Sequence, residues 1–426
     1  MSIDCKVVVV GAGPAGMAAA TVAAESGCRV CLLDDNPTPG GQIWRALNPE
    51  EASRGPHGKT FAQWDRRMRA TNLDLCFGAR VIARPATKVL RIEREGQWED
   101  VPFDRLIVAT GARERFLPFP GWTLPGVMGA GGLQALVKAG LPIKNKKIVL
   151  AGSGPLLLAV AAGLAKPGAH IAGVFEQAPM KRLVWFGVTL LTQPRKLVEG
   201  VGYGSSLLRS YRTGSWVTHA HGSGHLKSVS ISVGGVRHEI ECDYLGCAFH
   251  LVPNLELPQL LGCEMDAGYV KVDDSLQTSI AGVYCAGEIA GIGGLEKSLL
   301  EGEIAGLAVA GRALDRLMAR RKRYVRFARR LDAAFFPRSE IRDLADEETL
   351  VCRCEDVARK ALVPCRNWRE AKLHTRCGMG SCQGRICGPA TSFLFGWTHE
   401  SVRPPLLPAS ISGLTAKCDD TAKSSL

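Results

Sequence analysis

The chain has 426 residues, of which 46% are hydrophobic and 22% charged, and a formal net charge of +12. This length predicts two or three domains, and the concentration of its 48 glycines in short loops excludes a low-complexity chain. Much of the basic excess falls in one helical-looking stretch, Arg312–Arg330, with no RNA- or DNA-binding motif beside it, so no nucleic-acid partner is expected.

The amino-terminal residues and the cysteines indicate the compartment. The run MSIDCKVVVVGAGPAG lacks a basic region and leads straight into a strand, a turn and a helix, so no signal peptide is expected. Glycine, proline and charge interrupt each apolar stretch before it reaches membrane length, so no transmembrane segment is expected. Most of the fifteen cysteines are scattered through apolar segments, as reduced thiols are. We therefore expect a cytoplasmic protein.

The first predicted unit is a dinucleotide-binding fold. Lys6–Val10 is a valine-rich run typical of a strand buried in a parallel sheet, and it leads into Gly11, Gly13 and Gly16 in the G-x-G-x-x-G pattern. A helix of small residues follows, and the next strand ends at Asp34, 18 residues after Gly16, where an acid binds the ribose of an adenine dinucleotide. A glycine-rich turn without a ligand is the weaker alternative.

The fold alone leaves FAD and NAD open, and three later segments bear on the choice. They are the loop Gly40–Gln42, the turn Ala109–Gly111 after a buried strand, and the pair Gly287 and Glu288 after a hydrophobic run. With them the chain resembles the two-dinucleotide-binding-domain flavoproteins, the superfamily of glutathione and thioredoxin reductases. Glu288 departs from the aspartate that most members carry. The resemblance implies FAD contacts by Gly11, Gly13, Ala15, Gly16, Asp34, Asp35, Gly40, Gly41, Gln42, Ala109, Thr110, Gly111, Gly287, Glu288 and Gly293.

A second dinucleotide-like fold is predicted between the halves of the first. Lys147–Leu150 is a short strand followed by Gly152 and Gly154, and Glu176 stands where a ribose acid would. Leu157 occupies the third glycine position, where a bulky side chain should push the helix off the strand. The sequence therefore leaves open whether this fold binds NADH, ATP or nothing.

A dithiol beside the flavin is absent from the sequence. Disulfide reductases of this fold carry a cysteine pair after the GG loop or in the inserted domain, but GGQIWRALNPE has no cysteine. Ser153–Gln259 contains only Cys242 and Cys247. This argues against a thiol–disulfide relay.

Four cysteines near the carboxyl end predict a metal centre. Cys352 and Cys354 form a CRC pair, and after 22 intervening residues Cys377 and Cys382 form the pair CGMGSC. The glycines let the backbone turn tightly and free N–H groups to point at sulfur. The spacing is not that of a common zinc finger and no histidine has a finger-like offset, so an iron–sulfur centre is favoured over structural zinc.

The segments LVCRCEDV, WREAKLHTRCGMGSCQGRICGPA and FHLVPNLEL narrow the resemblance. The chain is similar to the α subunits of multisubunit FAD-dependent amine dehydrogenases, which include opine oxidase, D-hydroxyproline dehydrogenase, dye-linked L-proline dehydrogenase and hydrogen cyanide synthase. It is more distantly similar to part of the sarcosine oxidase α subunit. The resemblance implies a small helical domain like bacterioferritin-associated ferredoxin, with Cys352, Cys354, Cys377 and Cys382 as the four ligands of a [2Fe–2S] cluster. We interpret Cys365 and Cys387 as packing thiols.

The predicted fold class is α/β: a two-dinucleotide-binding-domain flavoprotein, in which a Rossmann-like FAD domain carries an inserted NAD(P)-type Rossmann-like domain, plus a helical [2Fe–2S] domain. We expect the FAD domain over residues 1–120 and 251–330 and the inserted domain over 121–250. The cluster domain is expected over 340–400 and a carboxyl-terminal tail over 401–426.

The resemblance also implies an electron relay. A β flavoprotein subunit would oxidise a CH–NH bond of a secondary amine or imino acid, so no catalytic residue is expected here, and D-hydroxyproline is the favoured substrate over proline or an opine. The basic stretch and the proline-rich VRPPLLPASISGL are expected docking faces for that partner, and a small ferredoxin-like γ subunit stays open. Two alternatives are an NADH-dependent flavin and iron–sulfur reductase acting alone, and a structural subunit with degenerate nucleotide sites.

Overall fold

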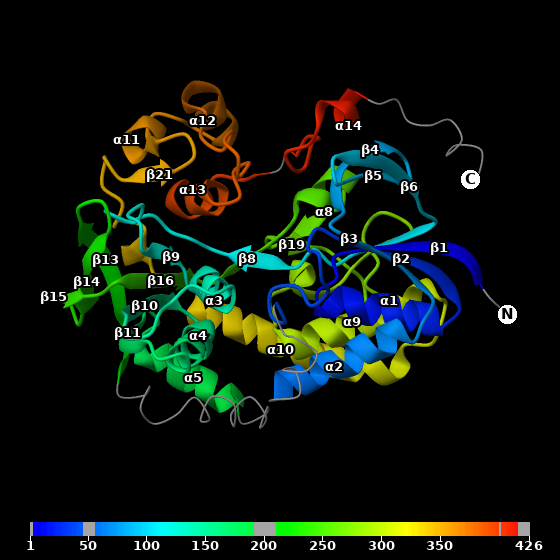
Figure 1. Ribbon diagram of the computed structural model, residues 1–426, viewed down its shortest axis with the longest axis horizontal. Coiled ribbons are helices and arrows are strands. Elements are labelled where there is room, and N and C mark those ends of the chain that lie inside the picture. Colours follow the sequence, from blue (N-terminus) through cyan, green and yellow to red (C-terminus); the bar gives the residue numbers. More distant parts are fainter. Residues whose placement is uncertain (1–2, 46–55, 191–209, 400–401, 416–426) are drawn as a thin grey trace. The chain divides into compact units, whose positions relative to one another are not determined.

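The computed structural model describes residues 3–45, 56–190, 210–399 and 402–415 (Figure 1). The chain divides into two compact units. Unit 1 consists of Met1–Arg113, Pro253–Arg329 and Glu400–Leu426, and unit 2 of Glu114–Val252 and Arg330–His399. The chain leaves and re-enters unit 1 through two short paired strands, β8 (Ala112–Glu114) and β17 (Leu251–Pro253).

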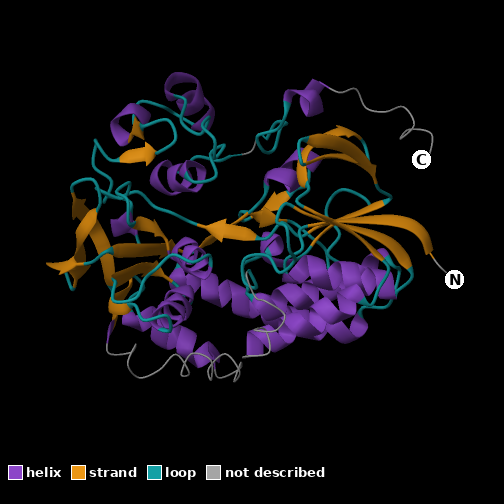
Figure 2. Ribbon diagram, viewed as in Figure 1, coloured by secondary structure: helices purple, strands orange, loops and turns teal. Residues whose placement is uncertain are grey.

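Unit 1 is built on a parallel sheet of five strands, drawn in orange in Figure 2. Their order is β20 (Val283–Cys285), β7 (Arg105–Val108), β1 (Ile3–Val10), β2 (Cys28–Asp34) and β3 (Leu73–Phe77). Val10 of β1 pairs with Leu33 on one side and Val108 on the other, so the loops after β1, β2 and β7 meet at one edge.

Alternation along β1 divides the core of unit 1 into two layers. Val7 and Val9 face α1 (Pro14–Glu25), α2 (Pro56–Arg69) and α9 (Leu295–Val309). Val8 and Val10 face the antiparallel strands β4 (Arg80–Ala86), β5 (Val89–Arg94) and β6 (Gln97–Pro102), together with α8 (Glu256–Leu261). The first predicted dinucleotide fold is therefore a parallel sheet covered on both faces.

Unit 2 repeats this plan in its first part. A parallel sheet has the order β12 (Tyr211–Thr213), β11 (His170–Glu176), β10 (Lys147–Ser153), β16 (Tyr244–Phe249) and β9 (Val127–Gly129). One face packs against α3 (Ala130–Lys138) and α4 (Leu156–Ala165), the other against β13 (Ser215–Gly222) and β14 (Leu226–Val233). The remaining elements here are β15 (Val236–Glu241), beside β14, and α5 (Met180–Leu190), after β11.

The carboxyl-terminal part of unit 2 is a small module with its own core. It contains β21 (Leu350–Cys352), β22 (Val357–Ala358), α11 (Arg359–Leu362), α12 (Trp368–Thr375) and α13 (Cys387–Phe395). The asparagine Asn367 caps α12 by accepting from the N–H of Glu370 at 2.9 Å. The predicted small helical domain is thus present, with three short helices and a two-stranded ribbon.

Two segments outside these sheets correspond to the expected docking faces. The basic stretch is helical as expected, within α10 (Asp315–Phe335). The proline-rich segment packs against other residues of unit 1. Leu406 is buried and its N–H donates to Ile82 O at 2.8 Å, and Arg91 donates to the carbonyl of Gly413 at 3.1 Å near α14 (Ile411–Thr415). Residues 402–415 of the expected carboxyl-terminal tail therefore pack against β4 and β5 of their own unit.

The thirteen cysteines whose side chains the structure describes form no disulfide with one another. Among the described helices, none combines the length and the apolar composition that crossing a lipid bilayer requires.

Candidate functional site: two dinucleotide folds and a cysteine group

The first glycine loop is packed backbone against backbone. A Cβ on Gly11, whose φ is +104°, would lie 2.3 Å from the carbonyl oxygen of Ala109. A Cβ on Gly16 would lie 1.6 Å from Gly11 O, so α1 can only approach β1 this closely with glycine there. Gly13 differs, because its Cβ would meet nothing closer than the Cα of Gly41 at 3.8 Å. Gly11 therefore makes the turn, Gly16 lets α1 pack closely against the loop after β1, and Gly13 lies on the side of the loop that is open to a ligand.

The acid at the end of β2 closes the same loop. The carboxylate of Asp34 accepts hydrogen bonds from the N–H of Ala12 at 2.5 Å and from the N–H of Asn36 at 2.7 Å. Asp35 beside it is exposed. Gly40 donates its N–H to Ala12 O at 2.8 Å, which brings the GG loop onto the first glycine loop. The predicted acid and both glycine loops therefore meet at the carboxyl edge of the sheet.

The Ala109–Gly111 turn is held by a residue without a sequence-assigned role. Asn254 donates its side-chain amide to Thr110 O at 2.7 Å and its backbone N–H to Gly111 O at 3.0 Å. In return the hydroxyl of Thr110 donates to Asn254 O at 2.9 Å. Asn254 lies within FHLVPNLEL, and the only signal that pointed to it was its position just before the return into the flavin fold.

The late glycine–acid element forms a buried network of its own. Glu288 accepts from Gly294 N–H at 2.8 Å and from the hydroxyl of Ser298 at 3.3 Å, so its carboxylate lies at the amino end of α9. Burial raises the pKa of Glu288. Lys297 in the first turn of α9 is 1% exposed and donates to Gly287 O at 3.1 Å and to Glu301 at 2.6 Å. This network fixes the backbone of the element.

The remaining predicted FAD residues lie along the same edge or beneath it. Ala15 is buried in the first turn of α1 and is where a Cβ on Gly287 would collide, at 2.8 Å. Gly293 is buried against Lys297, and Gln42 is exposed. The predicted set is thus drawn from five segments that are far apart in sequence.

In the inserted fold the predicted residues also come together, and they are more deeply buried. Glu176 is fully buried and accepts from Gly154 N–H at 2.7 Å and Ala178 N–H at 2.8 Å. Burial raises the pKa of Glu176 to about 7. A Cβ on Gly152 would lie 2.0 Å from Ala248 O, whereas Leu157, at the third glycine position, is fully buried in the core.

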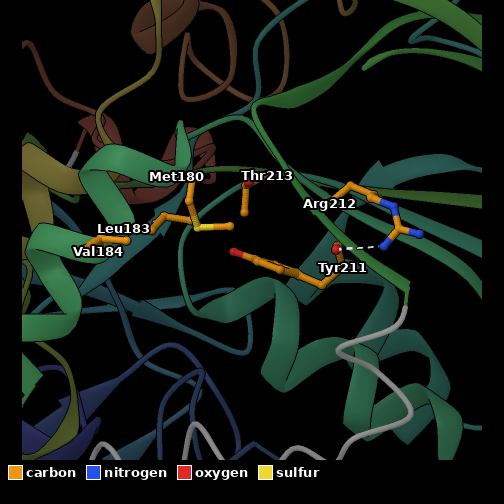
Figure 3. A pocket seen from close by; sticks show the side chains of 6 residues that line it. All are labelled: Met180, Leu183, Val184, Tyr211, Arg212 and Thr213. Atoms are coloured by element: carbon orange, nitrogen blue, oxygen red, sulfur yellow. Dashed lines mark hydrogen bonds between the residues drawn. The ribbon is translucent and has the colours of Figure 1, made fainter. Parts of the chain in front are cut away.

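A pocket of about 570 Å³ lies at the outer edge of this sheet. Figure 3 shows Met180, Leu183 and Val184 projecting from α5 on one side, and Tyr211, Arg212 and Thr213 from β12 on the other. Burial is the main cause that raises the pKa of the Tyr211 hydroxyl. The Arg212 guanidinium donates to the carbonyl of Tyr211 at 3.2 Å. The pocket is a surface hollow between a helix and an edge strand.

Five cysteines gather in the carboxyl-terminal module. The Sγ atoms of Cys352, Cys377 and Cys387 lie within 4.8 Å of one another and all three residues are buried. Cys382 is hydrogen-bonded to Cys387 and to Cys354, the latter being exposed at the rim. The structure therefore brings the four predicted ligands together and adds Cys387 at their centre. Cys387, interpreted from the sequence as a packing thiol, is buried in the module's core and also lies among these thiols, while Cys365 lies apart, with its Sγ 3.8 Å from Ala361 O.

The thiols of this cysteine group favour bound cations. Hydrogen bonds from Cys377 and Cys387 lower the pKa of Cys352 to about 2, and a hydrogen bond from Cys387 lowers the pKa of Cys382 to about 5. The pKa values of Cys377 and Cys387, which donate to these thiolates, are raised. Backbone N–H groups of Gly378 and Gly384 also point at sulfur atoms. Such a set of thiolates with amide donors suits a soft metal or an iron–sulfur cluster.

Glycines shape the cradle around these sulfurs. A Cβ on Gly380 would lie 2.4 Å from the Cβ of Cys354, and a Cβ on Gly378, whose φ is +80°, would lie 2.4 Å from the indole of Trp368. The turn between the second pair of predicted ligands therefore needs glycine for close approach, as the sequence indicated.

Comparison with a family of known proteins covers both dinucleotide folds. Residues 5–312 match the family model described as pyridine nucleotide-disulphide oxidoreductase. The chain belongs to this family. It is therefore a flavin-dependent oxidoreductase by family, and the predicted enzyme class is confirmed at that level.

Similarity to individual proteins extends over nearly the whole chain. An opine oxidase subunit of Rhizobium meliloti (strain 1021) is 36% identical over 95% of this chain and 97% of its own length. The hydrogen cyanide synthase subunit HcnB of Pseudomonas aeruginosa is 31% identical over 90% of this chain and 91% of its own. The alpha subunit of sarcosine oxidase from Corynebacterium sp. (strain P-1) is 26% identical over 72% of this chain but only 32% of its own. The predicted resemblance to this type of subunit is confirmed.

Solved structures confirm the fold class. L-Proline dehydrogenase from P. horikoshii superposes with a TM-score of 0.70 over 97% of this chain and 80% of its own, at 17% identity. Thioredoxin reductase from T. acidophilum superposes with a TM-score of 0.54 over 72% of this chain and 98% of its own, at 22% identity.

The residues present fit both groups that the sequence predicted. The Gly13 and Gly41 pair forms a cradle that a side chain on Gly41 would fill, since a Cβ there would lie 2.8 Å from the Cα of Gly13. A dinucleotide pyrophosphate requires this kind of open backbone surface at a helix amino end. The cysteine group supplies five thiol side chains, one more than the four that a [2Fe–2S] cluster needs as ligands.

Proposed function

We propose that this chain is the electron-transferring subunit of a multisubunit dehydrogenase that oxidises a secondary amine or an imino acid. The observation that carries the proposal is the gathering of five thiols in one module of a chain whose first fold is built to hold a dinucleotide. Relatives named as subunits of opine oxidase, hydrogen cyanide synthase and sarcosine oxidase support a place in a heteromeric complex.

We assign FAD to the first fold and a [2Fe–2S] cluster to the cysteine group. When bound, FAD exchanges one or two electrons and the cluster exchanges one, so together they couple two-electron to one-electron redox chemistry. Gly11, Gly13 and Asp34 would hold the adenine half of FAD, and Asn254 would keep the Ala109–Gly111 turn in place beside it. The predicted cluster ligands are Cys352, Cys354, Cys377 and Cys382, and Cys387 competes for one of these four places.

Amine oxidation itself is assigned to a partner flavoprotein subunit. Two observations support this division of labour: the late acid Glu288 is already bonded to Gly294 and Ser298, and the charged pair Lys297 and Glu301 is buried as a structural network. Within the substrate class a cyclic imino acid such as D-hydroxyproline is favoured, and the fold similarity to an L-proline dehydrogenase supports that class without selecting the substrate. The scatter of the cysteines through apolar segments supports a reducing, cytoplasmic location.

Co-purification with the natural partner tests the proposal. The chain should be expressed with and without the polypeptide that it retains at high salt, and both preparations assayed with imino acids and an artificial dye acceptor. We expect turnover only in the complex. Oxidation of an amine by the purified single chain would overturn the proposal.

Serine replacements identify the ligands. Cys352, Cys354, Cys377, Cys382 and Cys387 are each replaced by serine, with Cys365→Ser as the matched control because this thiol belongs to the same module but lies outside the cysteine group. Four of the five replacements should remove the visible and electron paramagnetic resonance signals of the cluster, and Cys365→Ser should keep them. Retention of the signals in all five variants would contradict the assignment.

A further inference from the structure

The carboxyl edge of the sheet in unit 2 is where a dinucleotide would lie. Its strand order places β11 and β12 on one side of β10, and β16 and β9 on the other, so the order reverses between β10 and β16. Ligands of open α/β sheets bind outside the carboxyl ends of the strands at such a reversal. The residues that stand there are Ser153 at the end of β10, Gln177 just after β11 and His250 just after β16.

All three of these residues bond to one segment of the chain, Asp332–Arg338, which comprises the last turn of α10 and the three residues after it and is called here the closing segment. The hydroxyl of Ser153 donates to the carbonyl of Phe335 at 2.6 Å. The side-chain amide of Gln177 donates to Ser153 Oγ at 2.9 Å.

The remaining contacts extend across the whole edge. The same Gln177 amide donates to the carbonyls of Phe335 and Phe336, each at 3.4 Å, and the Gln177 carbonyl accepts from Arg338 N–H at 3.0 Å. The imidazole of His250 is hydrogen-bonded to Asp332. Three neighbouring strands thus end on the same seven residues.

Side-chain packing fixes the closing segment in this place. Phe335 is 4% exposed and meets the ring of Phe186 edge to face at a centroid distance of 5.2 Å. The guanidinium of Arg338 stacks on Trp216 at 4.3 Å from the ring centroid. Aromatic and cation–π contacts of this kind each contribute on the order of 1 kcal/mol, so the segment is anchored at its middle and at its carboxyl end.

The charges at this edge are wrong for a dinucleotide. The last carbonyls of a helix have no partner within the helix and carry its partial negative charge. Here the carbonyls at the end of α10 and the carboxylate of Asp332 face the edge where a pyrophosphate would otherwise bind. The loop N–H of Gly154, which would serve that pyrophosphate, donates instead to the buried carboxylate of Glu176.

We propose that the closing segment occupies the carboxyl edge of the sheet in the inserted fold, where a dinucleotide would otherwise bind. By doing so it excludes NAD(P)H from this chain. The carbonyl oxygens of Phe335 and Phe336 take the place of phosphate oxygens. The inserted fold then packs against the end of α10 and is not a site from which NAD(P)H reduces the flavin. This inference is independent of the substrate and of the cluster.

NADH titration of the intact chain is the first test. We expect no saturable quenching of NADH or protein fluorescence up to about 1 mM, and no bleaching of the bound flavin under anaerobic conditions. Saturable binding of NADH below about 100 µM would overturn the proposal, as would flavin reduction by NADH.

Hydrogen exchange on the same protein is the second test. Peptides that cover the closing segment should exchange at least about 10-fold more slowly than those of an exposed loop, and Gln177→Ala should raise their rate about 10-fold. Phe336→Ala is the matched control, because this side chain is 52% exposed while its carbonyl is retained. Fast exchange of the closing segment in the wild-type chain would overturn its occupancy of the edge even if NADH fails to bind.

Discussion

Gly16 and Leu157 stand at the same position of the two dinucleotide folds, and the contrast between them describes the difference between the folds. At Gly16 a single added carbon would lie 1.6 Å from a backbone oxygen, because α1 presses on β1. At Leu157 a whole leucine is buried in a hydrophobic core, so α4 does not approach β10 in that way. The first fold keeps α1 close to β1, as in folds that bind a pyrophosphate, whereas in the inserted fold the side chain of Leu157 fills the corresponding space.

The acids of the two folds make equivalent hydrogen bonds, to the glycine loop and to the residue two positions on, but the edges beside them differ. Asp34 bonds to its own glycine loop and to Asn36, at an edge that also holds the GG loop. Glu176 is fully buried, and the edge beside it is occupied by the closing segment. The comparison teaches that a glycine motif and a well-placed acid are retained in a fold whether or not the cofactor edge stays open.

The largest effect is expected from a methyl group at the third position of the first loop. Gly16→Ala should destabilise unit 1 by at least about 3 kcal/mol, because the clash involves backbone on both sides. Leu157→Ala, the matched change in unit 2, should cost about 2–5 kcal/mol through a cavity but leave the flavin in place. Urea unfolding with flavin absorbance as a second readout separates the two. Stable, flavin-bound Gly16→Ala protein would contradict the assigned packing.

Replacement of Gly13 in the same loop should affect cofactor binding without affecting stability. Its Cβ would meet only the Cα of Gly41 at 3.8 Å and its φ is −71°, so Gly13→Ala should keep the melting temperature of the flavin-free protein. The added methyl faces the side where a pyrophosphate must approach the backbone, so bound FAD should fall at least about 10-fold. A Gly13→Ala chain that retains a full complement of FAD would remove this loop from the FAD site.

Stability of unit 2 should depend on pH through Glu176. Its pKa is raised by burial from 4.5 to about 7, so the folded protein holds a proton there that the unfolded chain releases. The destabilisation is absent below about pH 4.5, grows as the pH rises to about 7, and is constant above it. The upper limit is about 3 kcal/mol, from the difference of about 2.5 pKa units.

Glu176→Gln should flatten this pH dependence of the unfolding free energy. Glu241→Gln, at an exposed acid of the same unit, is the control and should leave the slope between pH 4.5 and 7 unchanged. Equal slopes in wild type and Glu176→Gln would show that the buried carboxyl is not protonated on folding.

The smallest effect is expected at Asn254. Asn254→Ala removes one amide donor to Thr110 O and one acceptor for Arg113, which should cost about 1–2 kcal/mol and loosen FAD a few-fold. Asn254→Asp keeps an acceptor for Arg113 but loses the donor, so it should resemble alanine in FAD retention. Wild-type affinity in the aspartate variant would indicate that the brace on the Ala109–Gly111 turn has no part in holding FAD.

Local patterns predicted the features that neighbouring residues determine. The valine-rich strand before Gly11, the glycines of both loops and the acids Asp34 and Glu176 were expected from spacing, and the structure brings each of them to the edge of a sheet. Helix α10 was expected from its basic run.

Long-range contacts were not predictable in this way. The hydroxyl of Ser153 meets a carbonyl 182 residues away, and Arg91 meets a carbonyl 322 residues away in the carboxyl-terminal segment. Neither residue has a distinctive sequence neighbourhood, because a single hydrogen bond to a backbone oxygen places no demand on the sequence at the acceptor. The place of Cys387 in the cysteine group was missed for a related reason. Sequence spacing identifies close pairs of cysteines, whereas Cys387 reaches the group only because α13 packs back onto Cys352 and Cys377.

The most direct test of the central claim is the composition of the chain purified without oxygen. The account predicts about one FAD, about two irons and about two acid-labile sulfides per chain, with the iron and sulfide lost together in Cys352→Ser and retained in Cys365→Ser. Zinc in place of iron and sulfide, or a chain that carries no flavin, would contradict it.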